Sequence, residues 1–194
     1  GFREDLEADS LFMRSYVDIE GSGEGITTIN SAISTGSGTI VGANNSELRF
    51  VTVKNTGEAG QQDAALFSES TSPRYTHVTA VASGGNDNDA IHIANGTPVL
   101  SYVPATALGR SLSTGVANFG GLLIASNSTF SAADAANTNL GVLSTFGGTV
   151  RATGSTITAS GGVIAVGLRT NNGTHALANM TISASGATES YGIY

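Results

Sequence analysis

Carboxylate and amide side chains that could bind a cation alternate in the run Gly84–Asp89, which reads GGNDND. Alternating carboxylate and amide oxygens in a glycine-led loop suit a hard cation such as Ca²⁺, so Asp87 and Asp89 are candidate metal ligands. The same composition is typical of an ordinary polar turn, whose side chains hydrogen-bond to the backbone. The run GGNDND is therefore compatible with a Ca²⁺ site as well as with an ordinary turn, and we expect no other cofactor.

The acidic residues and histidines that could support catalysis fall at different positions of a sequence repeat, which is described below. Polysaccharide hydrolases need a pair of carboxylates that flank the scissile bond. Six acidic residues fall at different positions of the repeat, so we expect them to scatter over the turns: Asp63, Glu69, Asp87, Asp89, Asp134 and Glu189. The three histidines, His77, His92 and His175, also differ in position, so we expect no shared zinc site. The absence of cysteine excludes disulfides and thiolate metal sites. We therefore assign no catalytic residue and favour a protein that is not an enzyme.

Aromatic and arginine side chains are the candidates for binding a carbohydrate. Aromatic rings offer flat apolar surfaces to a ligand, and binding residues concentrate in the loops between regular elements. We expect four exposed aromatic residues there, namely Tyr75, Tyr102, Phe119 and Phe146. Arg74 and Arg151 complete the set; each precedes a predicted strand by four residues, three repeats apart, so these two should not touch.

A sequence repeat positions all of these residues. A short strand that ends in a small-residue turn recurs six times, starting at Val51, Val78, Val103, Ser128, Ser155 and Met180. The last residues of successive copies lie 25 or 27 positions apart, which is typical of a solenoid. Each repeat also opens with another short strand, such as Ile91-His92-Ile93.

Alternation within the recurring strand indicates which side faces the core. Apolar residues alternate with Thr or Ser, the pattern of a half-buried strand, and the outward positions form a ladder of threonines. We predict an all-β parallel β-helix of about six to seven coils in a single domain. Residues 1–39 would form an N-terminal cap and entry coil, with a short helix over Asp5–Phe12, and residues 40–194 the repeats.

Net charge and hydropathy argue against two classes of binding partner. The net charge is −7, the pI is about 4.7 and Lys54 is the single lysine, so a phosphate backbone or an anionic membrane surface would repel the chain. No apolar run approaches the 18 residues or so of a membrane span. We therefore expect neither nucleic-acid binding nor membrane insertion. The last residues, Tyr191–Tyr194, match the start of another repeat, so we expect the solenoid to continue in a longer parent chain. Assembly of that parent chain into a homotrimeric fibre is an alternative that the sequence does not decide.

The segment VDIEGSGEGITTI at residues 17–29, followed by repeats of the form x-T-[VI]-x-A-S-G, resembles the right-handed parallel β-helix repeat proteins of the pectin-lyase-like superfamily. The resemblance covers residues 16–194 and implies a right-handed β-helix. Many members are polysaccharide lyases, hydrolases or esterases, and many others are adhesins or fibre domains without catalysis. The esterase pattern fails here, because that family has its second catalytic aspartate in a Gly-Thr-Val-Asp-Phe context, whereas Gly96-Thr97 continues into Pro98-Val99.

We therefore expect an extracellular or cell-surface fibre or adhesin domain, of bacterial type. Its turn loops would recognise a cell-surface glycan or polysaccharide. Two alternatives stay open: a carbohydrate-active enzyme of the pectinase or pectin esterase kind, and an ice-binding β-helix that uses the threonine ladder.

Overall fold

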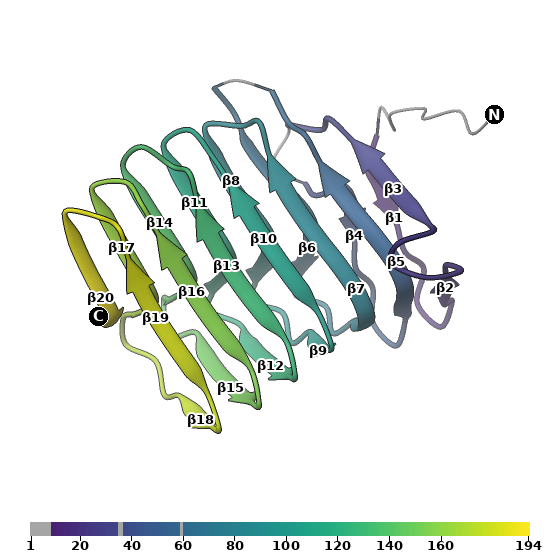
Figure 1. The fold of residues 1–194 in the computed structure, drawn as a ribbon. Coiled ribbons are helices and arrows are strands. Elements are labelled where there is room, and N and C mark those ends of the chain that lie inside the picture. Colours follow the sequence, from purple (N-terminus) through teal and green to yellow (C-terminus); the bar gives the residue numbers. More distant parts are fainter. Residues whose placement is uncertain (1–8, 35–36, 59) are drawn as a thin grey trace.

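The protein is a parallel β-solenoid of about seven turns (Figure 1). The computed structural model describes residues 9–34, 37–58 and 60–194. Every regular element within these ranges is a β-strand. Strands of successive turns lie side by side and pair in parallel, so residues one repeat apart form columns along the solenoid axis. The predicted all-β solenoid is confirmed.

One wall of the solenoid is an eight-stranded sheet. Its strands follow the order β1-β4-β6-β8-β11-β14-β17-β20, so each turn contributes one strand. Their bounds are β1 Leu11–Phe12, β4 Ile40–Val41, β6 Gln62–Glu69, β8 Asp87–Ala94, β11 Leu112–Phe119, β14 Thr138–Thr145, β17 Ile164–Thr170 and β20 Glu189–Ile193.

The remaining strands form a twelve-stranded sheet that is folded into two walls. The long strands β5 (Glu47–Asn55) and β7 (Arg74–Ser83) run along both walls, and each later turn uses two shorter strands instead. The other strands are β2 Ile19–Glu20, β3 Thr28–Ser31, β9 Val99–Ser101, β10 Pro104–Leu108, β12 Leu122–Ser126, β13 Thr129–Ala133, β15 Thr149–Thr153, β16 Thr156–Ser160, β18 Ala176–Ala178 and β19 Thr181–Ser185. At the bend between the walls one residue per turn has a left-handed backbone, and in the first three such turns it is aromatic: Phe50, His77 and Tyr102.

The core lies between the three walls and follows the predicted alternation. The residues expected to face inward in the recurring strands are buried from Val51 to Ala159, including Val78, Phe130 and Ile157. In the last described turn the inward residues Met180 and Ile182 are only partly buried, because each has a neighbouring turn on one side only among the described residues. Alternation with a period of two thus assigned the core correctly.

The strands of the eight-stranded sheet share one kink. In β8 the two consecutive residues Ala90 and Ile91 are both fully buried. The residue-by-residue pairing of β8 with its two neighbouring strands includes Asp89 and Ile91 but skips Ala90. The same position holds a small residue in each strand from β6 to β20: Ala65, Ala90, Gly115, Gly141, Gly167 and Gly192. At Gly115 an added Cβ would lie 2.5 Å from the Gly141 carbonyl oxygen and 2.9 Å from the Ser131 nitrogen. The kink therefore presses two walls together and admits only small side chains.

A buried polar column lies at the start of these strands. Asp63, Asn88, Ser113 and Asn139 occupy the same position in four successive turns and are at most 1% exposed. The Asn88 side chain accepts a hydrogen bond from the Gly85 amide at 3.1 Å and donates one to the Gly85 carbonyl at 3.0 Å. Such contacts satisfy the backbone of the turns that enter the sheet.

The N-terminal segment forms a regular first turn. Strands β1, β2 and β3 pair with β4 and β5 of the next turn. The helix expected over Asp5–Phe12 is wrong for its described part, because Leu11–Phe12 is strand β1; residues 1–8 lie outside the described ranges. Hydrogen bonding to the next turn, Leu11 N to Thr39 O at 2.9 Å, explains the extended backbone.

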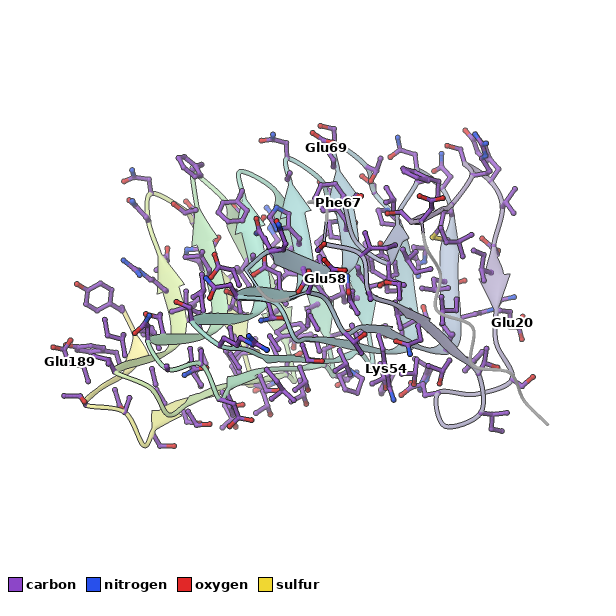
Figure 2. The ribbon with its side chains drawn as sticks, turned by 90° about the horizontal axis from the view of Figure 1, so that it is seen from above. Glu20, Lys54, Glu58, Phe67, Glu69 and Glu189 are labelled. Atoms are coloured by element: carbon purple, nitrogen blue, oxygen red, sulfur yellow. The ribbon has the colours of Figure 1, made fainter. Side chains whose placement is uncertain are left out.

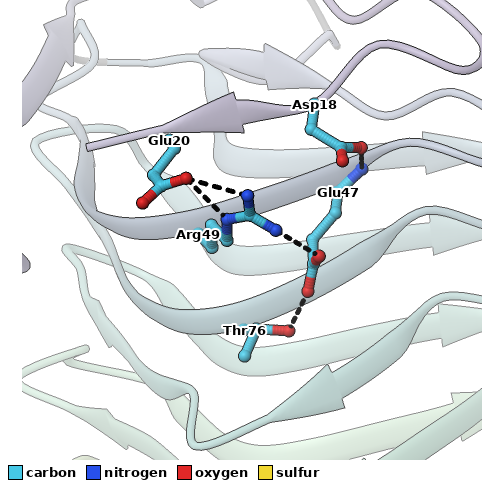
Figure 3. A network of polar contacts seen from close by, with 5 residues as sticks. All are labelled: Asp18, Glu20, Glu47, Arg49 and Thr76. Carbon is cyan, nitrogen blue, oxygen red and sulfur yellow. Dashed lines mark hydrogen bonds and ion pairs between the residues drawn. The ribbon is translucent and has the colours of Figure 1, made fainter.

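A polar network ties the first three turns together on the outside of the twelve-stranded sheet (Figure 3). Arg49 donates to Glu20 at 2.8 and 3.0 Å and to Glu47 at 3.1 Å. Glu47 also accepts a hydrogen bond from Thr76, and its amide donates to Asp18. Hydrogen bonding to Glu20 raises the pKa of the Arg49 guanidinium, which therefore stays charged.

Tyr75 was expected to be an exposed ligand-binding residue, and this is wrong: the side chain is fully buried in β7. Its ring fills the core and its hydroxyl lies 3.2 Å from the Ser68 hydroxyl. We expect Tyr75→Phe to lower the free energy of unfolding by about 1 kcal/mol, because the buried Ser68 hydroxyl loses this partner. Urea denaturation measures the change, with Tyr102→Phe as the exposed control; equal stability of Tyr75→Phe and wild type would contradict the prediction.

Candidate functional site

The candidate site lies on the outer face of the eight-stranded sheet. Gln62 in β6 and Asp87, Asp89 and His92 in β8 share this face, since their neighbours Asp63, Asn88 and Ile93 alternate with them and point inward. Gln62 and Asp87 are register partners in adjacent strands. We call this surface the outer face.

A carboxylate and an imidazole pair at the centre of this region. Asp89 Oδ2 lies 2.8 Å from His92 Nδ1 and accepts a hydrogen bond from the Gln62 amide at 3.2 Å. The Asp89 side chain is only 5% exposed and that of His92 is 17% exposed. The pair is therefore sheltered, with the imidazole as its more accessible member.

Thr114 adds an unsatisfied polar group next to this pair. It is the register partner of Asp89 in the neighbouring strand β11 and is 1% exposed. Its Oγ1 has no hydrogen-bond partner among the described residues. Buried hydroxyls are normally paired, so the Thr114 hydroxyl beside Asp89 lacks an interaction that the described chain does not supply.

An aromatic row runs along the edge of the outer face over four successive turns. The ring of His92 stacks on Phe67 with centroids 5.2 Å apart and lies 5.0 Å from Phe119, which in turn lies 6.2 Å from Phe146. Phe67, labelled in Figure 2, comes from β6, His92 from β8, Phe119 ends β11, and Phe146 follows β14. We call these four residues the aromatic row.

Two of the predicted aromatic ligand residues thus come together. Phe146 lies in a turn and is 80% exposed, as expected. Phe119 was expected in a turn but is the last residue of β11 and is half-buried, because His92 and Phe146 flank its ring.

Tyr102 lies elsewhere, at the bend of the twelve-stranded sheet. It is 49% exposed, and its ring is stacked on His77 at 4.7 Å with an interplanar angle of 2°, while Phe50 covers the other face of His77 at 5.4 Å. This second stack leaves only one face of Tyr102 free. Tyr102 therefore does not belong to the aromatic row.

Arg74 and Arg151 occupy one column on the outside of the twelve-stranded sheet. The register runs from Arg74 through Val99 and Ile124 to Arg151, so two strands separate the arginines and they do not form a joint site. Both are exposed. A shallow apolar hollow of about 480 Å³ lies beside Arg151, lined by Val99, Ile124 and Leu177.

The candidate metal ligands Asp87 and Asp89 lie in strand β8 and not in a loop. Within the described residues no group of three or more His, Asp or Glu side chains is placed to share a metal ion. Burial, followed by the nearby charge of Asp89, raises the pKa of Asp87. One Asp89 oxygen is already used by Gln62 and His92, so a cation would have to compete with both.

The other carboxylates of the repeats are dispersed only in part, and the expectation that all six acids differ in repeat position is wrong for Asp87 and Glu189. Asp63 points inward, Asp134 lies at a corner, and Glu189 shares the Asp87 column with three strands between them. At that far end Glu189 accepts a hydrogen bond from Tyr191, Arg169 lies over the Tyr194 ring at 5.7 Å, and the four residues line a hollow of about 70 Å³.

The threonine ladder is discontinuous. Thr52 pairs with Thr79, Thr129 with Thr156 and Thr156 with Thr181, but Pro104 separates the two groups. Thr52 is also buried, at 6% exposed. The exposed hydroxyls therefore do not form one regular array.

Comparisons with family models, curated proteins and solved structures gave no match to this chain. Fold and site thus rest on this structure. Among the described residues no helix has the length and apolar character that crossing a bilayer requires.

The sequence interpretation missed the pairing of Asp89 with His92 and the contribution of Phe67. Only the contribution of Phe67 had a readable signal in the sequence. Phe67 and His92 lie 25 positions apart, the spacing of the repeat, which places them in one column. Asp89 and His92 are three residues apart, a spacing that shares a face only because the kink at Ala90 shifts the alternation.

Proposed function

We propose that this solenoid binds a polysaccharide along its outer face. The observation that carries the proposal is the aromatic row, which follows the solenoid axis over four turns and ends in the exposed ring of Phe146. Strands of successive turns are about 4.8 Å apart, so an extended polymer that lies along the axis would meet a new side chain at every turn.

The groups beside the row suit sugars. Carbohydrate-binding surfaces combine apolar rings with a few fixed polar groups, and Gln62 and Thr114 next to the row, with His92 within it, supply such groups. The rigid parallel ladder holds these side chains in place before the ligand arrives, which lowers the entropy cost of binding.

This role agrees with a fibre or adhesin domain of the right-handed, pectin-lyase-like β-helix type, displayed outside the cell. The polymer would be a cell-surface glycan or a polysaccharide of the surroundings. In this proposal the main contact is the outer face, together with the turn that carries Phe146, and not the bend that carries Tyr102.

Binding should depend on the aromatic row. We expect Phe119→Ala combined with Phe146→Ala to weaken binding to immobilised mannan, xylan or mixed-linkage β-glucan at least tenfold, since the rings supply the apolar contact area. Biolayer interferometry measures the affinity.

Tyr102→Ala is the matched control, because it removes an exposed ring from the other bend. It should bind like the wild type. Loss of binding in Tyr102→Ala but not in the double variant, or no binding of the wild type to any of the three polymers, would contradict the proposal.

A carbohydrate-active enzyme is the second candidate, and one observation favours it. Asp87 and Asp89 are two residues apart on the same side of β8, roughly 7 Å along the strand, which lies within the range that separates the carboxyl groups of inverting hydrolases. Asp89, however, is engaged by Gln62 and His92. Release of reducing ends from any polymer of the panel, abolished in Asp87→Asn, would establish this candidate in place of pure binding.

A further inference from the structure

We infer that the outer face selects glycans without carboxylate groups, and that Asp89 positions His92 to accept a hydrogen bond from a sugar hydroxyl. The inference rests on the proposed polysaccharide binding and names the class of polymer. It draws on the Asp89–His92 pair, on Thr114 and on the distribution of charge over β6, β8 and β11.

The Asp89–His92 contact sets the imidazole tautomer. A carboxylate can only accept hydrogen bonds, so in the neutral ring the proton is on Nδ1, which faces Asp89 at 2.8 Å. Nε2 then carries a free lone pair, and it forms no hydrogen bond within the described chain. A sugar hydroxyl can donate to this nitrogen, whereas a carboxylate cannot.

The ring is also held in place. Phe67 stacks on one side of His92 and Phe119 lies on the other, while the Gln62 amide holds Asp89. Asp89 is itself too buried to reach a ligand freely, at 5% side-chain exposure. It therefore acts through His92 as a positioning residue, as second partners of histidine do at other binding sites.

Thr114 points to a ligand independently. Its hydroxyl is on the outer side of β11, opposite Asp89, and has no partner within the described residues. Leaving a buried hydroxyl unpaired is unfavourable. A hydroxyl-rich ligand over this position would satisfy it.

The charges here disfavour an acidic polymer. Strands β6, β8 and β11 carry the acidic residues Glu69, Asp87 and Asp89 on their outer side and contain no lysine or arginine. Figure 2 shows Glu69 beside Phe67, and Lys54 on the opposite side of the solenoid. A uronate that lies over this region would meet like charges within a few ångströms, which weakens binding several-fold per contact.

The test compares mannan with polygalacturonate for the wild type, Asp87→Asn and Asp134→Asn. We expect the wild type to bind mannan at least tenfold more tightly. Asp87→Asn should raise the ratio of polygalacturonate to mannan affinity several-fold, and less so in 0.5 M salt, because salt screens the repulsion. Asp134→Asn removes an exposed charge from another corner and should leave the ratio unchanged.

The positioning of His92 by Asp89 is tested by two separate measurements, the tautomer of the imidazole and the affinity for mannan. Nitrogen NMR of the His92 ring should show a protonated Nδ1 and an unprotonated Nε2 in the neutral imidazole, and His92→Phe, which keeps the stacked ring, should weaken mannan binding about fivefold. The opposite tautomer, or unchanged binding in His92→Phe, would overturn this role.

Failure of the inference differs from failure of the proposed function. Equal affinities of the wild type for mannan and polygalacturonate, with both still lost in the Phe119 and Phe146 double variant, would overturn the selectivity and keep the binding face. Absence of binding to both polymers would overturn both.

Discussion

Gly115→Ala should lower the free energy of unfolding by about 3 kcal/mol. The new Cβ would lie 2.5 Å from the Gly141 carbonyl oxygen and 2.9 and 3.1 Å from the backbone of Ser131. These are backbone atoms of two different walls, so neither can rotate away as a flexible side chain would. Relief requires the walls to separate at the kink, which loosens the core on both sides.

Gly25→Ala is the control for this substitution. No heavy atom lies within 4 Å of its added Cβ, and its backbone is not left-handed, so its stability should stay within about 0.5 kcal/mol of the wild type. Urea denaturation of both variants measures the difference. A Gly115→Ala protein as stable as Gly25→Ala would show that the walls are not pressed together at the kink.

Asp63→Asn should make the protein more stable than the wild type by about 3 kcal/mol at pH 7.5, and this advantage should vanish near pH 3.5. Asp63 is 1% exposed, and neither of its oxygens has a partner in hydrogen-bonding geometry among the described residues. Burial, reinforced by the charge of Glu58 and opposed in part by the nearby Gly85 amide, raises its pKa from 3.8 to about 6.

The direction of the effect follows from the protons bound by each state. Between pH 3.8 and about 6 the unfolded chain has lost the Asp63 proton while the folded chain keeps it, so stability falls as pH rises. Below pH 3.8 Asp63 is protonated in both the folded and the unfolded state, and above about pH 6 the full loss of stability has been reached. At about 1.4 kcal/mol per pKa unit, the shift corresponds to about 3 kcal/mol.

Asparagine cannot ionise and already occupies this column at Asn88 and Asn139, where its amide satisfies the adjoining turn. Urea midpoints of wild type and Asp63→Asn, measured from pH 3.5 to 7.5, isolate the contribution of this one group. A stability difference that does not change with pH would mean that Asp63 is not a buried ionisable group of raised pKa.

Most of the fold could be predicted from the sequence repeat. Copies of one strand at intervals of 25 or 27 residues predict stacked turns, and alternation assigned residues such as Val78 and Phe130 to the core. The first turn was harder to recognise, because β1 and β2 have only two residues each and their apolar positions are weakly periodic.

The candidate site was only partly predictable. Phe119 and Phe146 could be chosen as ring-bearing residues near turns, but Tyr75 could not be told from them, because a tyrosine becomes a core residue when a partner such as Ser68 meets its hydroxyl. The Asp89–His92 pair depends on the kink at Ala90, where two neighbouring residues face inward. Strict alternation would place Asp89 and His92 on opposite faces.

Hydroxyl-radical footprinting with and without mannan is the most direct test of the central claim that the outer face binds a polysaccharide. In the free protein Phe146, Tyr102 and Tyr16 are accessible, at 80%, 49% and 81% exposure, so all three should be oxidised. With saturating mannan we predict that oxidation of Phe146 falls strongly while Tyr102 and Tyr16 react as before. Protection of Tyr102 with unchanged oxidation of Phe146 would place the polymer on another surface and contradict the account.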